Sequence, residues 1–170
     1  HRTPQRSQPC DAPKGSSATR LVVHAQGRLA SGLLHQADAC LGEALRQQPA
    51  LAQAHYLRGG VYVMGGATNR AVPFFRAALS HNPTHGDAYF ELGNALYGTQ
   101  QLRGAEAAYR AALAVQPERA LCYANLGNLY REEGEPARAE RAYRIALALQ
   151  PSGADSCPAH NGLGNALEAD

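Results

Sequence analysis

The sequence predicts an all-α solenoid built from antiparallel helix pairs, because three kinds of residue recur with one 34-residue spacing. A proline marks the end of each unit, at Pro49, Pro83, Pro117 and Pro151. A small residue recurs as Ala37, Ala71, Ala105 and Ala139. A bulky residue recurs as Leu41, Phe75, Tyr109 and Tyr143. A fixed period of this length is typical of chains in which each unit is one helix pair that stacks on its neighbours.

Each unit contains two helical stretches. In the third unit, apolar residues at Tyr89, Leu92 and Leu96 keep the three-to-four-residue step of a helix face. A second stretch over 102–113 keeps the same step, and Gly98-Thr99-Gln100 interrupts the pattern between them. The small positions let the two helices approach closely, and the aromatic side chain of the partner helix fills the space beside them. The proline ends the second helix and leads into the next unit.

The fullest unit is the fourth, with Tyr123, Leu126-Gly127, Tyr130, Ala139, Tyr143, Ala146 and Pro151. On these residues the chain resembles the tetratricopeptide repeat family. The second unit departs from the family pattern with His55 and Arg58, and the first is the least regular, as a capping repeat would be. The resemblance implies a right-handed superhelix in which the first helix of each pair lines a concave groove.

The repeats divide the chain into segments. Residues 1–17 are rich in Pro, Ser, Gln and Arg, so we expect a disordered tail or linker there. Four repeats follow, over 18–51, 52–85, 86–119 and 120–153. About three extra residues between Ser152 and Pro158 then precede a partial fifth repeat over 154–170. Because its first helix lacks a covering helix, we expect a fragment of a longer protein, or pairing with another copy through Leu163, Ala166 and Leu167.

Composition excludes several classes of protein. The chain has 16 basic and 14 acidic residues, a formal net charge of +2, which argues against nucleic-acid binding. No apolar run is long enough to predict a membrane span. The cysteines are far apart in the sequence and form no metal-binding or redox motif, so we expect a reduced, intracellular and cytoplasmic protein. Cys40 and Cys122 are predicted to be small buried hydrophobic residues.

The sequence predicts neither catalysis nor a bound cofactor or metal. No serine lies in a GxSxG motif, and Gly65-Gly66 lacks the GK[ST] of a phosphate loop. His81 and His85 have a metal-like spacing, but Asn82-Pro83 breaks the helix that would place them on one face. The mixed charges over 131–141 are interpreted as a solvated face.

Helical spacing, together with the family resemblance, predicts a partner-binding groove lined by Tyr56, Phe90, Asn94, Tyr97, Asn125, Asn128, Arg131 and Asn165. An asparagine amide offers both a donor and an acceptor, so a row of them suits the backbone of an extended peptide, and the aromatic residues would add apolar area. The alternative is that the asparagines bond the neighbouring helix and fix repeat packing. Under the first interpretation, Asn94→Ala with Asn128→Ala weakens partner binding and leaves the melting temperature nearly unchanged.

Two narrower resemblances bear on the partner. Some tetratricopeptide domains hold the C-terminal carboxylate of heat-shock chaperones, and Asn94 and Asn125 match two of their clamp residues. Phe90, Pro158 and Gly162 stand where the clamp needs cations, so we expect no chaperone carboxylate clamp. The phrases over 89–94 and 123–128 resemble the substrate-recruiting arm of O-linked N-acetylglucosamine transferases. Two functions therefore stay open: a protein-interaction adaptor, or the recruiting arm of a larger enzyme.

Overall fold

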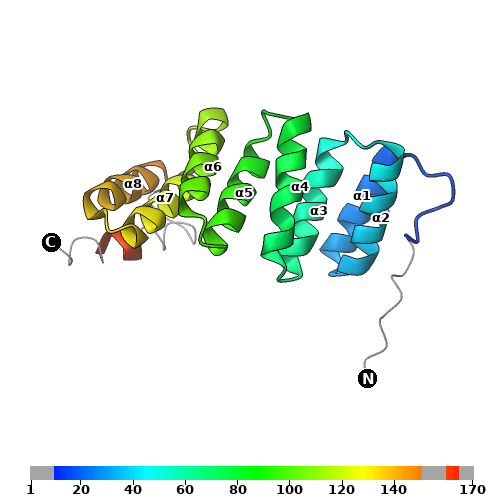
Figure 1. The fold of residues 1–170 in the computed structure, drawn as a ribbon, viewed down its shortest axis with the longest axis horizontal. Coiled ribbons are helices and arrows are strands. Elements are labelled where there is room, and N and C mark those ends of the chain that lie inside the picture. Colours follow the sequence, from blue (N-terminus) through cyan, green and yellow to red (C-terminus); the bar gives the residue numbers. More distant parts are fainter. Residues whose placement is uncertain (1–9, 151–159, 165–170) are drawn as a thin grey trace, which may run out of the picture. The chain divides into compact units, whose positions relative to one another are not determined.

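The computed structural model describes residues 10–150 and 160–164, and these residues are helical with no β-strand. The chain divides into two compact units between Thr84 and His85. Unit 1 holds α1 (Ala18–Ala30), α2 (Leu34–Gln47), α3 (Ala52–Met64) and α4 (Thr68–His81) (Figure 1). Unit 2 holds α5 (Gly86–Gly98), α6 (Leu102–Val115), α7 (Ala120–Glu132) and α8 (Pro136–Leu149). Residues 160–164 are also helical.

Consecutive helices pack as pairs. In unit 1, α1 packs on α2 and α3 on α4, and α2 also contacts α3. In unit 2, α5 packs on α6 and α7 on α8, and α6 also contacts α7. The predicted all-α class and the predicted helix pairs are both confirmed.

A glycine on the first helix of a pair faces an aromatic ring on the second. A Cβ added to Gly93 would lie 2.5 Å from Cε1 of Tyr109, far inside van der Waals contact. The same approach recurs with Gly59 against Phe75 and with Gly127 against Tyr143. The three rings are almost completely buried. The periodic small and bulky positions are therefore the two sides of one close helix contact, as the sequence predicts.

The turn within each pair contains one residue with a positive φ angle. This residue is Gly32 (72°), Gly66 (75°), Gln100 (60°) or Gly134 (73°), and each lies 34 residues after the one before. The residue that follows it donates its backbone N–H to a carbonyl five residues earlier, as in the 2.8 Å bond from Glu135 N to Tyr130 O. This pattern is the Schellman-type ending that favours glycine in the left-handed region. The third repeat places glutamine where the others place glycine.

Residues 10–17 do not extend away from the repeats as a tail would, and we name them the N-terminal strap. Cys10 forms a disulfide with Cys40 of α2, which is completely buried. Gln47 Nε2 donates to Ser16 O at 3.2 Å, and the Ser17 side chain caps α1. These covalent and polar contacts, which the composition of 1–17 does not reveal, hold the strap on α1 and α2. Residues 1–9, the insertion at 152–158 and residues 165–170 lie outside the described part of the chain.

No helix among the described residues is both long enough and apolar enough to cross a membrane.

Candidate functional site

Most of the predicted groove residues lie in unit 2, on the first helix of each pair. Helix α5 carries Phe90, Asn94 and Tyr97, and α7 carries Asn125, Asn128 and Arg131. Their three-to-four-residue spacing places each set along one face of its helix. Tyr56 lies on α3 of unit 1, where its ring is half-buried and 6.1 Å from that of Phe75. Asn165 is outside the described residues.

Asn94 is the centre of a hydrogen-bond network within unit 2. Its Oδ1 accepts from the Tyr109 hydroxyl at 2.9 Å and from Asn125 Nδ2 at 2.9 Å. Its Nδ2 donates to Glu91 Oε2 at 3.4 Å. Both lone pairs of the carbonyl oxygen are therefore used inside the protein. For Asn94 this geometry favours the interpretation that the asparagine fixes repeat packing.

Asn128 repeats part of this geometry one unit later. Its Oδ1 accepts from the Tyr143 hydroxyl at 2.8 Å, just as Asn94 accepts from Tyr109. Within residues 10–150 and 160–164, Asn128 Nδ2 has no hydrogen-bond partner, and the side chain is half-buried. The tyrosine thus fixes the orientation of the amide.

Phe90 is buried, whereas the sequence predicts that it exposes an aromatic surface to a partner. The side chain is only 8% exposed, its ring lies 6.1 Å from that of Tyr109, and the Arg119 guanidinium sits 4.1 Å above it. Arg119 is in turn held by an ion pair with Asp87. Because the ring is covered on one face by a cation and on another by tyrosine, Phe90 supports the repeat instead of offering apolar surface. Arg119 lies in the loop before α7, and the repeat pattern of the sequence does not predict its contact with Phe90.

Tyr97 and Arg131 form the outer part of this face. The Tyr97 hydroxyl donates to Glu132 Oε1, and burial together with this carboxylate raises the pKa of Tyr97 to about 12. Tyr97 therefore stays neutral at physiological pH. Arg131 is exposed. Tyr97 of α5 thus bonds the last turn of α7, the helix that also carries Asn128 and Arg131.

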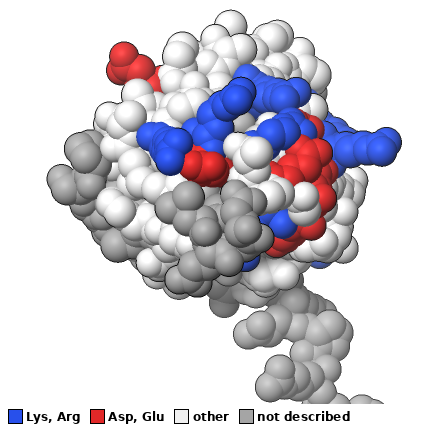
Figure 2. Space-filling view, turned by 90° about the vertical axis from the view of Figure 1, so that its left-hand side faces the viewer, with Lys and Arg blue, Asp and Glu red and all other residues white. Residues whose placement is uncertain are grey.

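Charged side chains of α8 form ion pairs with residues of the same helix, with its N-cap Glu135 and with Glu106 of α6. Figure 2 shows basic and acidic side chains interleaved around α8, with no large patch of one sign. Arg138 bonds Glu135 and reaches Glu106 of α6 at 2.7 Å, while its guanidinium covers the Tyr130 ring at 3.9 Å. Burial alone would raise the pKa of Glu106. The hydrogen bonds from Tyr130 and Arg138 have the larger combined effect, so the pKa of Glu106 lies below its ordinary value.

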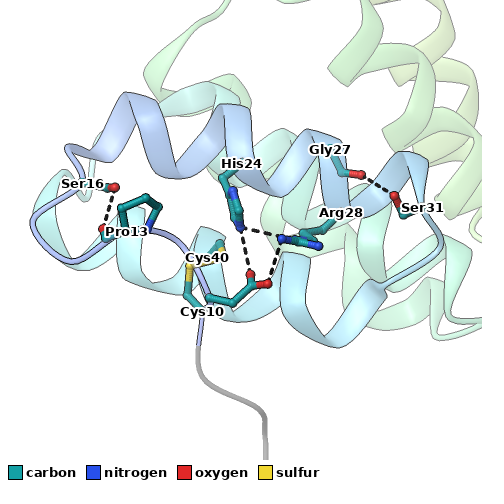
Figure 3. A network of polar contacts seen from close by, with 9 residues as sticks. Cys10, Pro13, Ser16, His24, Gly27, Arg28, Ser31 and Cys40 are labelled. Atoms are coloured by element: carbon teal, nitrogen blue, oxygen red, sulfur yellow. Dashed lines mark hydrogen bonds and ion pairs between the residues drawn. A yellow bond between two sulfur atoms is a disulfide. The ribbon is translucent and has the colours of Figure 1, made fainter.

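A second cluster, in unit 1, was not predicted. The strap brings Asp11 to His24 and Arg28 of α1: His24 Nε2 lies 2.8 Å from Asp11 Oδ1, and Arg28 Nη2 lies 2.8 Å from Asp11 Oδ2. Figure 3 shows the Cys10–Cys40 disulfide directly beside them. The hydrogen bond with His24 is the main reason that the pKa of Asp11 is lowered. We name Cys10, Asp11, His24, Arg28 and Cys40 the Cys10 cluster.

The Cys10 cluster corrects two expectations. The sequence predicts reduced cysteines and no Cys/His grouping, because no short motif joins these residues along the chain. The fold instead bonds Cys10 to Cys40 across 30 residues of sequence. It also places ligand atoms of Asp11, His24 and Cys40 within 4.8 Å of one another. Cys122 is buried as predicted, and burial raises the pKa of its thiol to about 11.

Comparison with protein families agrees with the repeat geometry. The chain matches the tetratricopeptide repeat family over residues 22–86, 90–154 and 124–170, and a second description of the same repeat over 62–117. This chain belongs to the tetratricopeptide repeat family. The comparison with curated proteins gives no match.

Several solved tetratricopeptide structures share the fold. A MamA structure is 22% identical, with a TM-score of 0.77, covering 89% of this chain and 86% of MamA. MamA 41-end from Desulfovibrio magneticus RS-1 is 23% identical, with a TM-score of 0.76, and the coverage is 92% and 96%. Pseudomonas aeruginosa PilF is 23% identical, with a TM-score of 0.76, covering 89% of this chain and 69% of PilF. At such identities the likeness concerns the fold alone.

Proposed function

We propose that this tetratricopeptide repeat protein is an interaction module that binds an extended peptide or a partner helix through unit 2. Tetratricopeptide repeats are in general protein-binding scaffolds, and the candidate surface consists of Tyr97, Asn125, Asn128 and Arg131. The observation that carries the proposal is the Asn128 amide, whose Oδ1 is fixed by Tyr143 while its Nδ2 has no partner in the described chain. A donor that is already oriented loses little conformational entropy when a peptide carbonyl reaches it.

The other predicted groove residues take different parts in this proposal. Asn94 and Phe90 support the surface from behind, because their polar and aromatic groups are already engaged within the unit. Tyr56 and Asn165 stay predictions as contact residues. The module acts by binding: we propose no catalysis, cofactor, nucleic acid or chaperone clamp for it.

A peptide-display library tests the proposal even though the partner is unidentified. Random peptides are selected on the full chain, and the Kd of each selected peptide is then measured for Asn128→Asp combined with Arg131→Ala. The introduced aspartate keeps an acceptor for the Tyr143 hydroxyl and removes the Nδ2 donors, so the fold is spared while the proposed contact is lost. We expect affinity to fall about tenfold or more, the equivalent of one or two hydrogen bonds.

The matched control is Arg141→Ala, which removes an exposed arginine from α8 on the far helix of the same pair. Peptides that bind at the proposed surface should bind this variant as tightly as the parent chain. Selected peptides that bind both variants equally well would locate the binding surface elsewhere and refute the proposal.

The alternative function, the recruiting arm of a larger enzyme, would use the same binding surface. It differs from an adaptor in that the parent protein would carry a catalytic domain after the repeats. This alternative is supported by the repeated Leu-Gly-Asn motif, which occurs as Leu92-Gly93-Asn94 and as Leu126-Gly127-Asn128. Sequencing the transcript past the codon for Asp170 tests it: a glycosyltransferase domain would favour the arm, and a single covering helix would favour an adaptor.

The cytoplasmic location is likewise a proposal, and it depends on the redox state of the cysteines. A lasting Cys10–Cys40 disulfide is typical of an oxidising compartment, whereas cytosolic reductants keep such pairs as thiols. Alkylation of thiols in intact cells, followed by mass analysis, distinguishes the two. Modified Cys10 and Cys40 are expected for a cytoplasmic protein, and a protected disulfide would contradict that location.

A further inference from the structure

Four potential metal ligands meet in the Cys10 cluster, and they come from three separate segments of unit 1. Asp11 lies in the strap, His24 on α1 and Cys40 on α2, and their ligand atoms all lie within 4.8 Å of one another. Cys10 is not one of these three residues, but it brings a second sulfur next to Cys40, because its Sγ is bonded to that of Cys40. Ligand atoms of a tetrahedral Zn²⁺ are about 3 to 4 Å apart, since Zn–S bonds are about 2.3 Å and Zn–N bonds about 2.0 Å. To form a metal site, the two sulfurs must separate after reduction and the other ligand atoms must approach one another, by shifts on the order of 1–2 Å.

The hydrogen bonds of His24 conflict with one another when no cation is present. Its Nε2 lies 2.8 Å from Asp11 Oδ1 and 3.3 Å from Arg28 Nε (Figure 3). If Nε2 carries a hydrogen, it donates to Asp11, but that hydrogen then faces the N–H of Arg28. If Nε2 carries none, it accepts from Arg28, but its lone pair then faces the Asp11 carboxylate. A cation between Nε2 and Oδ1 removes the conflict with Asp11, because both atoms then direct a lone pair at the metal.

The charges around the cluster suit a divalent cation. Two thiolates and the Asp11 carboxylate carry three negative charges, and Zn²⁺ neutralises two of them. Arg28 holds the second carboxylate oxygen, Oδ2, at 2.8 Å and balances the third charge. An outer partner of this kind orients a carboxylate ligand and leaves its other oxygen directed at the metal. Partial exposure of the Asp11 (42%) and His24 (26%) side chains gives an ion a route to the site.

We propose that the Cys10 cluster is a redox-controlled zinc site, bound by Cys10 Sγ, Cys40 Sγ, His24 Nε2 and Asp11 Oδ1 when the disulfide is reduced. Two molecules of a low-molecular-weight thiol supply two electrons and two protons, which break the S–S bond into two thiols, and the reductant leaves as its own disulfide. Zn²⁺ then displaces one proton from each thiol into solvent. Disulfide and zinc are alternative ways to fasten the strap to α1 and α2.

The test uses the full chain with Cys122→Ala and Cys157→Ser, so that Cys10 and Cys40 are its only thiols. The protein is reduced with a phosphine, freed of reductant and titrated with Co²⁺, whose thiolate charge-transfer and tetrahedral d–d bands report the ligands. We expect one Co²⁺ per chain, displaced by one Zn²⁺. The same chain with the disulfide intact is the control for the thiolates, and it should develop neither band.

Two further variants test the other ligands. His24→Ala and Asp11→Ala should each weaken Zn²⁺ binding at least tenfold. The matched control is His35→Ala, which removes an exposed histidine from α2 and should leave the affinity unchanged. Circular dichroism melts of the metal-free proteins show whether each variant is folded. If the reduced chain develops no Co²⁺ bands, or if His24→Ala and Asp11→Ala bind Zn²⁺ as tightly as the parent, the proposal is overturned.

Discussion

Asn125 of α7 donates from Nδ2 to Asn94 Oδ1 of α5 at 2.9 Å, and so joins the first helices of two successive repeats. The same oxygen accepts from the buried Tyr109 hydroxyl. Asn94→Ala therefore leaves a hydroxyl without its acceptor and breaks the link between repeats. We expect a loss of about 1–3 kcal/mol in the free energy of unfolding, measured by urea denaturation. This outcome differs from the unchanged melting temperature that the groove interpretation predicts from sequence.

Asn128→Asp provides the comparison for that substitution. It retains an acceptor for the Tyr143 hydroxyl, so its stability at neutral pH should stay within about 0.5 kcal/mol of the parent. If Asn94→Ala is no less stable than Asn128→Asp, the Asn94 network contributes little to folding, and Asn94 is again a candidate contact residue.

Two adjacent glycines of α3 are expected to respond in opposite directions to alanine. A Cβ at Gly59 would lie 2.5 Å from Phe75 Cε1, whereas a Cβ at Gly60 would meet nothing within 4 Å. Gly59→Ala should cost about 1–3 kcal/mol or more, because the paired helices must separate. Gly60→Ala should stabilise the chain by up to about 1 kcal/mol through helix propensity. Urea denaturation of both variants checks this, and similar values for the pair would contradict the close-packing argument.

Gln100 has a φ angle of 60° at the turn position that Gly134 fills one repeat later, at 73°. A side chain costs about 1 kcal/mol in this left-handed region, and glycine avoids that cost. Gln100→Gly should therefore raise the free energy of unfolding by about 0.5–1 kcal/mol, measured by urea denaturation. The reverse change, Gly134→Gln, is the control and should lower it by a similar amount. Equal stability of all three proteins would show that the turn tolerates the conformation without cost.

The contacts that sequence reasoning predicted are those that follow the repeat period. Gly93 and Tyr109 lie on the two helices of one repeat, so their contact is a property of the family geometry and reappears in every regular unit. The direction of the Asn94 amide was not predictable in the same way. The side chain of a half-buried asparagine can point either into the groove or toward the neighbouring helix. The amide of Asn94 points toward the helices because Tyr109 and Asn125 donate hydrogen bonds to its Oδ1.

The Cys10 cluster could not be predicted, because it lies in the least periodic part of the chain. Cys10 and Asp11 precede the first repeat, and their approach to His24 and Cys40 depends on the path of the strap over α1 and α2. Spacing along the sequence carries no information about such a path. The composition of residues 1–17, which is rich in Pro, Ser, Gln and Arg, instead predicts a disordered tail or linker.

Arg58 replaces the leucine of the family pattern and is held by Asp38 of α2. Its Nε donates to Asp38 Oδ1 at 2.6 Å, and its guanidinium lies 5.0 Å from the Phe74 ring centroid. Arg58→Ala should lower the free energy of unfolding by about 1–2 kcal/mol, since it removes a half-buried ion pair and the packing of a long side chain. Arg46→Ala is the control: its pair with Glu43 is exposed and within one helix, so the change should be below about 0.5 kcal/mol. If urea denaturation gives the same loss of unfolding free energy for Arg58→Ala and Arg46→Ala, the Arg58–Asp38 ion pair contributes no more to stability than an exposed pair.

Alkaline pH should destabilise the protein through Tyr109. Burial is the main reason that the pKa of this phenol is raised above its ordinary value of 10.0. The unfolded chain therefore releases the proton first, and stability is lost as the pH rises above 10. Tyr109→Phe should be less stable near pH 8 by about 1 kcal/mol, because the bond to Asn94 is gone, and it should lose stability less steeply between about pH 9.5 and 11. Urea denaturation at a series of pH values measures both slopes. Parallel slopes for the parent and the variant would show that other groups cause the alkaline loss.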